Sequence, residues 1–386
     1  TGPTYFINEF LFYVSGFNFA MEVADLQFVL ALQHVPNLGD ASAKKLIRHA
    51  GSAEAVFKEN KSALLKIDGI GSTKLGDLFS SKNLEAAEKE LEFILKNNIE
   101  TLYYQDKEYP EKLKHCLDGP ILLFKRGNID LINKKIISIV GTRRATTHGI
   151  VFCEKFIEEL APLDPVIVSG FAYGIDITAQ RAAIKYGLQT IGCLAHGLNQ
   201  IYPGAHQKYM AGVEENGGFF TDFWSTDAFD RNNFLKRNRI IAGLSEATAV
   251  IESAEKGGSL VTADIANSYN REVFAVPGRP GDPQSKGCNM LLKSQQAHIL
   301  TSAADIAYIL NWFSETSTKP VQKQLFVELE EEEQALYGYL KERGKEQLDL
   351  IALNCSIPTF KAATLLLNME LKGVVRPLPG KLFEAV

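Results

Sequence analysis

Cysteine is scarce in this sequence, and long hydrophobic runs are missing. The 386 residues hold 5 cysteines, all far apart and without a C-x-x-C pair. This usage argues against a disulfide framework and against a structural zinc site, and it fits a reducing compartment. No apolar stretch approaches the roughly 20 residues that a membrane-spanning helix needs. We therefore expect a cytoplasmic protein with no membrane partner.

The chain also lacks a strong excess of charge. Its 41 Lys and Arg residues and 46 Asp and Glu residues give a formal net charge of −5. Any nucleic-acid surface must therefore be a local patch, because the field of the whole molecule weakly repels phosphate. Hydrophobic residues at 46% and charged residues at 23% exclude a disordered, collagenous or coiled-coil protein. The length predicts two or three folded domains.

Motifs typical of catalysis are absent as well. The sequence holds no G-x-x-x-x-G-K-[ST] phosphate loop and no H-E-x-x-H metal motif. His196 and His206 flank one loop without a nearby cysteine or carboxylate, so we expect structural or surface residues instead of metal ligands. Asp176 fits a helix-start acid better than a catalytic carboxylate, because it has no evident partner. We predict no catalytic residue, no metal and no cofactor.

Residues 21–98 predict a helical domain, and we expect residues 1–20 to be an extension in front of it. Turns at Pro36–Gly39 and Gly69–Gly71 each precede a helical pattern, and the pair resembles a double helix-hairpin-helix, or SAM-like, domain. Such hairpins aim backbone N–H groups at a phosphate. A helical bundle that uses glycine turns is the alternative, since Asn37 stands where the motif usually carries its first glycine.

Residues 99–313 predict an α/β domain. Short β-branched runs alternate there with helix-compatible segments, which is typical of a buried, mainly parallel, doubly wound Rossmann-like sheet. In such sheets the ligand site lies beyond the carboxyl ends of the strands, where the loops gather. The predicted strands are Ile121–Phe124, Ile136–Gly141, Val166–Gly170, Thr190–Leu194, Gly218–Asp222, Ala247–Ile251, Val273–Val276 and His298–Leu300.

The C-terminal residues 331–386 follow a polar linker at 314–330 and predict a winged helix. Three helical segments precede two short strands that flank a Pro377–Gly380 turn, which is the order of that fold. Its candidate recognition helix, Thr359–Lys372, carries two lysines and one glutamate. This near-neutral balance favours protein docking or a structural role over DNA reading.

An arginine-bearing loop follows the strand Ile136–Gly141 and opens a helix. It offers free backbone N–H groups after Gly141, a positive helix end, and the guanidinium groups of Arg143 and Arg144, all suited to phosphate. It is not the dinucleotide fingerprint, because Arg143 stands where that motif has its second glycine. A pair of solvated loop arginines is the alternative.

The densest basic run extends from Arg231 to Arg239 without an acid. Basic side chains beside an exposed aromatic ring suit single-stranded nucleic acid, because phosphates contact the cations and a base stacks on the ring. Phe234 as a core residue at a helix start is the alternative. The candidate contacts in this run are Phe234, Lys236, Arg237, Asn238 and Arg239.

Glycine clusters end three further strands. Two of them supply candidate contacts, namely Ser169, Gly170 and Gly174 in one and Lys256, Gly258 and Ser259 in the other. Their backbone donors should meet the arginine loop at one sheet edge and form a long polar groove. A groove of this kind fits a polymer better than a small molecule.

Taken together, these motifs resemble the DNA-processing protein A (DprA/Smf) family. They span the predicted α/β domain almost from end to end. The residues that carry the resemblance are Tyr109-Pro110, Pro120–Leu123, Ile139–Arg143, Val168–Gly170, Gly174–Asp176, Ile201–Pro203, Phe234–Ser245, Gly258–Leu260 and Phe274–Gly278.

The resemblance implies a homodimer that binds incoming single-stranded DNA without sequence preference, shields it, and loads the RecA recombinase onto it in natural transformation of competent bacteria. It implies no catalytic activity. By motif, Arg143 would contact phosphate, Phe234 would stack on a base, and Arg237, Arg239 and Lys256 would be cations of the groove.

The sequence departs from the family pattern at three places. Leu235 stands where proline is usual, Ala179-Gln180 where Ala-His is common, and Thr221-Asp222 where Ser-Glu is frequent. The first departure affects how Phe234 is presented. The other two touch no proposed DNA contact.

Two other functions remain open from the sequence. A Rossmann-like nucleotide or phosphoribosyl hydrolase would carry a P-G-G-x-G-T-x-x-E run, but Lys256–Asp264 lacks its second Gly-Thr and its Glu. A winged-helix DNA-binding regulator is weakened by the near-neutral candidate recognition helix.

Overall fold

The structure, a computed structural model, describes residues 23–312, 329–378 and 382–385. The chain divides into two compact units, Thr1–Ser314 and Glu315–Val386. The extension expected at residues 1–20 lies outside the described residues, as does most of the expected linker at 314–330.

Five helices begin the described part of the first unit. They are α2 (Val23–Gln33), α3 (Asp40–Ala50), α4 (Ala53–Lys58), α5 (Lys61–Leu64) and α6 (Ser81–Lys96). The helix α3 forms because Ala43, Leu46 and Ile47 recur on one face, and all three are buried. The side chain of Ser52 caps α4 by accepting a hydrogen bond from Ala55 N at 3.0 Å.

A nine-stranded sheet forms the body of the first unit, in the order β1-β2-β6-β5-β4-β3-β7-β8-β9. β1 pairs antiparallel with β2, and β2 with β6, whereas all other neighbours are parallel. The strands are β1 (Glu100–Tyr103), β2 (Leu122–Gly127), β3 (Ile136–Val140), β4 (Val166–Ser169), β5 (Thr190–Cys193), β6 (Gly217–Thr221), β7 (Ala247–Val250), β8 (Glu272–Ala275) and β9 (His298–Ile299). The predicted α/β class with a mainly parallel sheet is confirmed, and β1 is a strand that the sequence did not predict.

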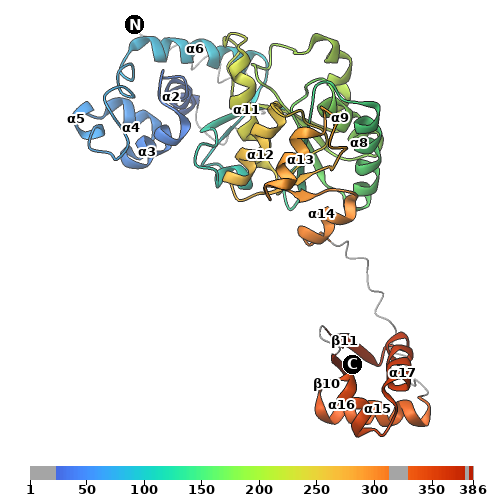
Figure 1. Ribbon diagram of the computed structural model, residues 1–386. Coiled ribbons are helices and arrows are strands. Elements are labelled where there is room, and N and C mark those ends of the chain that lie inside the picture. The colour runs from blue at the N-terminus through green and yellow to red at the C-terminus, as the bar shows by residue number, and fades with distance from the viewer. Residues whose placement is uncertain (1–22, 313–328, 379–381, 386) are drawn as a thin grey trace. The chain divides into compact units, whose positions relative to one another are not determined.

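Helices cover both faces of this sheet (Figure 1). One core packs β3, β4 and β7 against α11 (Arg231–Leu244), α12 (Gly258–Ser268) and α13 (Lys286–Lys293). The other core lies under α8 (Thr147–Leu160), α9 (Ile175–Lys185) and α14 (Ala303–Ile309). The described part of this unit also holds four shorter helices: α7 (Glu111–Lys114), η1 (Ala161–Leu163), η2 (Gly204–Tyr209) and α10 (Met210–Glu215).

The strand order reverses direction at β3. The chain runs outward from β3 through β4, β5 and β6, and then returns to the other side of β3 to form β7, β8 and β9. At such a switch point the loops after neighbouring strands part and leave a crevice beyond the carboxyl ends. The loops after β3 and β7 flank this position.

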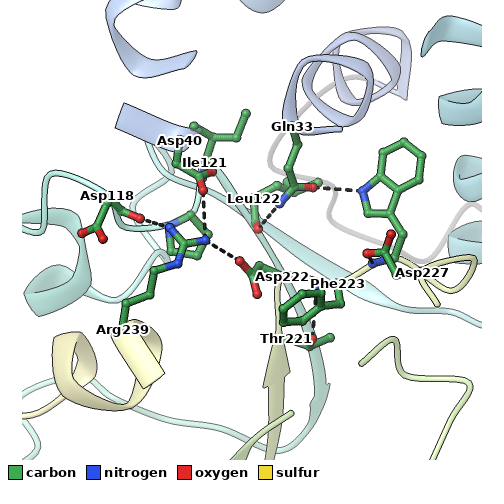
Figure 2. Close-up of polar contacts among 12 residues, drawn as sticks. Gln33, Asp40, Asp118, Ile121, Leu122, Thr221, Asp222, Phe223, Asp227 and Arg239 are labelled. Carbon is green, nitrogen blue, oxygen red and sulfur yellow. Dashed lines mark hydrogen bonds and ion pairs between the residues drawn. The ribbon is translucent and has the colours of Figure 1, made fainter. Parts of the chain in front are cut away.

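Arg239 joins the N-terminal helices to the sheet (Figure 2). Its Nη2 atom lies 2.9 Å from Asp40 Oδ2 in α3 and 2.5 Å from Asp222 Oδ2, just after β6. Asp40 Oδ1 also accepts a hydrogen bond from Ile121 N at 2.8 Å. Burial alone would lower the pKa of Arg239, but the two carboxylates raise it well above its ordinary value, so this arginine remains a cation.

A second contact of the same junction is made by amide and indole groups (Figure 2). Gln33 Nε2 in α2 donates to Leu122 O at 2.9 Å, and Trp224 Nε1 donates to Gln33 Oε1 at 3.1 Å. Leu30, Phe219 and Trp224 belong to one continuous hydrophobic core. The N-terminal helices therefore pack on the sheet and share its core.

The described residues of the second unit form three helices and a small antiparallel sheet. Its elements are α15 (Glu331–Arg343), β10 (Lys345–Gln347), α16 (Leu348–Asn354), α17 (Thr359–Leu371), β11 (Val375–Leu378) and β12 (Leu382–Ala385). The sheet order is β10-β12-β11. The core of this unit includes Leu336, Leu340, Ile351, Leu366 and Met369.

Among the described residues, no single helix has both the length and the apolar character to cross a membrane. Leu348–Asn354 and Thr359–Glu370 meet that test of length and composition only when taken together, and they are bent by 107°.

Candidate nucleic-acid interface

A hollow of about 430 Å³ opens at the carboxyl ends of the parallel strands, beside the switch point. Its walls come from the loops after β3, β4 and β7, from the first three turns of α11, and from the start of α12. The lining residues include Gly141, Thr142, Arg143, Ala172, Asp176, Arg231, Asn232, Phe234, Asn238, Gly257, Gly258 and Ser259. The arginine loop, Phe234 and the Gly258-Ser259 turn thus meet at one sheet edge.

Arg143 is exposed on the β3–α8 loop and lies against Phe234. Its guanidinium carbon is 4.8 Å from the centre of the Phe234 ring, which is a cation–π contact. The loop is held from the other side, because Ile175 N at the start of α9 donates to Thr142 O at 3.2 Å. Gly174 permits this approach, since its φ is +79° and an added Cβ would collide with Thr142 O.

The N-terminus of α8, which follows the arginine loop, is already occupied by a carboxylate. Glu252 Oε2 accepts from Thr146 N at 2.9 Å, and Glu252 Oε1 accepts from the Thr146 hydroxyl at 2.5 Å. Thr146 in turn caps the helix by accepting from Gly149 N at 3.1 Å. The expectation that this positive helix end would hold a phosphate is therefore wrong, and the anion-binding groups left on the loop are the arginine side chains.

The N-terminus of α12 differs, because no side chain caps it. Its N-cap residue is Gly257, and Gly257, Gly258 and Ser259 all line the hollow. A helix start with free N–H groups and a positive dipole end attracts anions. Lys256 is exposed and directly precedes this turn, although it does not line the hollow itself.

Arg237 lines the hollow, but its side chain is largely buried and bonded within the fold. Its side chain is only 4% exposed, and Nη1 donates to Gly170 O at 2.7 Å and to Cys193 O. Burial lowers its pKa, and nearby Asp176 opposes that shift. Burial likewise raises the pKa of Asp176, against the effect of Arg237. Arg237 thus lines the hollow, as predicted, and its guanidinium also fastens α11 to the ends of β4 and β5.

Comparison with known proteins identifies the family. The model of the family described as DNA recombination-mediator protein A matches residues 100–311. Protein Smf of Escherichia coli is 34% identical over 283 residues, which cover 70% of this chain and 74% of that protein. The chain belongs to the DNA recombination-mediator protein A (DprA/Smf) family. The family resemblance predicted from the motifs is confirmed.

Other DprA/Smf relatives agree. The DNA processing protein DprA of Bacillus subtilis is 38% identical over 209 residues, covering 54% of this chain and 70% of that protein. The crystal structure of DprA from Streptococcus pneumoniae matches with a TM-score of 0.63 and 28% identity, over 75% of this chain and 98% of that chain. A structure describing the single-stranded DNA binding mode of DprA from Helicobacter pylori matches with a TM-score of 0.50 and 29% identity. The match covers 55% of this chain and 95% of that chain.

Two of the predicted cations of this DprA/Smf chain lie away from the hollow. Arg239 is engaged by Asp40 and Asp222 at the junction with the N-terminal helices, so it is not a groove cation. Lys236 is exposed but lines a different hollow of about 910 Å³. Five aspartates line that larger hollow: Asp40, Asp118, Asp222, Asp227 and Asp230.

The predicted hairpin at Pro36–Gly39 also lines the acid-rich hollow. Carboxylates around a set of backbone N–H groups repel phosphate, so this environment disfavours the phosphate contact expected there. Asp40, the first residue after the turn, uses its carboxylate for Ile121 and Arg239.

Several predicted contact residues support the site by packing. The hydroxyl of Ser169 is buried and donates to Ile139 O at 2.6 Å. An added Cβ at Gly170 would lie 2.5 Å from Asp176 Oδ2 and 2.7 Å from Arg237 Nη2, so only glycine fits there. Ser169 and Gly170 are therefore corrected to structural residues. Arg144 is exposed, and Asn238 lines the hollow although it is only 7% exposed.

Sequence reasoning did not single out several of the lining residues, among them Arg231 and Asn232. Arg231 and Asn232 are exposed in the first turn of α11 and line the hollow. Asp230 caps this helix by accepting from Asn232 N at 2.8 Å. The available signal was the acid-free run itself, which begins at Arg231.

We predict that Arg237→Ala lowers the free energy of unfolding by about 3–5 kcal/mol, because it leaves Asp176 as an uncompensated buried charge and two carbonyl groups without their donor. Arg143→Ala, at an exposed position, should change it by no more than about 0.5 kcal/mol. Urea unfolding of both variants is the measurement. Equal effects of the two substitutions would contradict the structural role of Arg237.

Proposed function

We propose that this chain is a non-catalytic protein that binds single-stranded DNA in the hollow at the sheet edge, without sequence preference. It shields incoming DNA in natural transformation and passes it to a RecA recombinase. The observation that carries the proposal is the meeting of exposed Arg143, the ring of Phe234 and the uncapped start of α12 in one hollow. The Helicobacter pylori relative, described for its single-stranded DNA binding mode, supports it.

The chemistry of the hollow favours unpaired strands. Phosphates can contact Arg143, Arg231 and the N–H groups of α12, and these contacts carry no sequence information. Phe234, partly buried in the first turns of α11, offers a ring to an unpaired base, whereas duplex bases present no free face. The hollow therefore suits backbone recognition with one stacked base.

A hydrolase is disfavoured because the carboxylates near the hollow are engaged. Glu252 accepts two hydrogen bonds from Thr146, and Asp176 is 7% exposed beside Arg237. A general acid or base must reach a substrate proton. These positions support a binding role without turnover.

We further propose that the second unit is a winged helix that docks a protein. The order α15-β10-α16-α17-β11-β12 supports the assignment. Both lysines near α17 pair with α15: Lys361 Nζ lies 2.6 Å from Glu332 and Lys372 Nζ 2.5 Å from Glu333. Phe360 is 78% exposed on the same helix. An apolar helix with committed cations fits protein docking better than DNA reading.

Homodimer formation is also proposed, through the sheet edge at β9. This strand is the last of the sheet in the described residues, and its residue Ile299 is 54% exposed. An edge strand with exposed apolar side chains is suited to pairing with a second copy. Light scattering should give the mass of two chains, and Ile299→Lys should give one. A monomer mass for the unaltered chain contradicts the proposal.

Binding and turnover measured together test the function. Labelled homopolymer strands and a duplex of equal length are titrated, and nucleoside monophosphates are incubated with the chain and analysed for base release. We expect tight binding to the single strands, weaker binding to the duplex, and no released base. Base release, or a preference for one duplex sequence, would favour the hydrolase or the regulator.

We predict that Arg143→Ala weakens binding of every single-stranded sequence alike and reduces the slope of log K against log salt by about 0.7, the value of one phosphate contact. Lys236→Ala is the matched control, because Lys236 is an exposed cation of α11 that lines the acid-rich hollow instead. It should leave the slope unchanged. The slope is measured by salt titrations with labelled homopolymers. An unchanged slope for Arg143→Ala would exclude this phosphate contact.

We also predict that deletion of residues 325–386 leaves most of the single-strand affinity in place, because the lining residues of the hollow all lie in the first unit. Filter-binding curves of the truncated and full-length chains on a long unstructured strand provide the comparison. A hundredfold loss in a folded truncation, roughly 2.7 kcal/mol, would move the main DNA site to the second unit.

A further inference from the structure

Three aromatic rings meet beside the hollow, and each comes from a different segment. Tyr202 lies on the loop after β5, Phe229 on the loop after β6, and Phe234 in α11. The ring centres are 4.9 Å apart for Tyr202 and Phe229, 5.5 Å for Tyr202 and Phe234, and 5.7 Å for Phe229 and Phe234. We call these three residues the aromatic cluster.

The aromatic cluster is exposed and lies outside the hydrophobic cores. Phe229 is 50% exposed and Tyr202 38% exposed. In the described residues, none of the three rings belongs to one of the packed cores or lies among the side chains packed against them. A phenylalanine that is half exposed contributes much less to stability than a buried one. Grouped exposed aromatic side chains on a folded protein mark a binding surface.

The geometry of the rings leaves faces for a ligand. The interplanar angles are 51°, 64° and 71°, so no two rings of the aromatic cluster stack face to face. A ring that meets its neighbour at an angle keeps its outer face for another flat group. Nucleobases are flat groups of this kind, and stacking on aromatic side chains tolerates any base.

The aromatic cluster is continuous with the cationic part of the hollow. Phe234 belongs to both, and the guanidinium of Arg143 lies over its ring. On the other side, Asp227 and Asp230 flank Phe229 in the sequence and line the acid-rich hollow. A nucleic-acid strand leaving Arg143 and Phe234 would meet the rings of Tyr202 and Phe229, which contact Phe234, with its phosphates directed away from those acids.

We propose that Tyr202 and Phe229 are base-stacking residues that extend the single-strand site beyond Phe234, so that at least two nucleotides are held by stacking. The proposal rests on the proposed function and deepens it. The cations and N–H groups of the hollow bind the backbone of the strand, and the aromatic cluster holds the bases that follow. Sequence tolerance results because stacking uses the faces of the bases.

The test distinguishes base stacking from backbone contact by removing either the aromatic ring of the protein or the base of the strand. The variants Phe229→Leu and Tyr202→Leu keep an apolar side chain but lose the ring, while Phe229→Tyr and Tyr202→Phe keep a ring. Each is titrated with a thymine homopolymer and with an abasic strand of equal length and charge. Phe360→Ala, at an aromatic position that is 78% exposed in the second unit, is the control.

We expect each leucine variant to weaken binding of the thymine strand roughly 5- to 150-fold and of the abasic strand less than about twofold. The ring-retaining variants and Phe360→Ala should bind as the unaltered chain does. Equal losses on both strands, or no loss on the thymine strand, would overturn the assignment of Tyr202 and Phe229. Failure of the unaltered chain to bind either strand would instead contradict the proposed function.

Discussion

The buried guanidinium of Arg237 holds the sheet edge on which the candidate site is built. It donates to the carbonyls of Gly170 and Cys193, at the ends of β4 and β5. This contact fixes α11 across the strand ends, so that Phe234, one turn earlier, projects beside the arginine loop. Gly170 must be glycine because a side chain there would displace both Arg237 and Asp176. The position of the aromatic ring therefore depends on a buried charge.

Ion pairs and hydrogen bonds within the fold also decide which charged groups can bind an anion. Arg237 and Arg239 are committed to the fold, one to backbone carbonyls and one to Asp40 and Asp222. The carboxylate of Glu252 occupies the start of α8. The exposed groups around the hollow that can bind an anion are the Arg143 side chain, Arg231, and the uncapped start of α12. A protein with a net charge of −5 can thus present a local cationic site, because five of its aspartates line a separate hollow.

The sequence allowed the sheet, the family and the arginine loop to be predicted, since alternating β-branched runs and glycine turns are local patterns. It did not reveal the burial of Arg237 and Arg239, because their partners are distant in the chain: Gly170, Cys193 and Asp40. Helical spacing indicates the burial of Arg237 in part, because it places Arg237 on the same face of α11 as the buried residues Asn233, Ile240 and Leu244. The occupied start of α8 was equally hidden, because Glu252 follows a different strand. Tyr202 and Phe229 meet Phe234 only through tertiary packing.

Hydrogen–deuterium exchange of the full chain, with and without a thymine homopolymer, tests the central claim most directly, namely that the strand binds at the carboxyl ends of β3 and β7. The account predicts slower exchange at the amides of Gly258 and Ser259 and along the loop 141–145 when the strand is bound. Exchange at the Pro36–Gly39 turn, beside the acid-rich hollow, should not change. Protection confined to that turn or to α17, with none at the start of α12, would contradict the account.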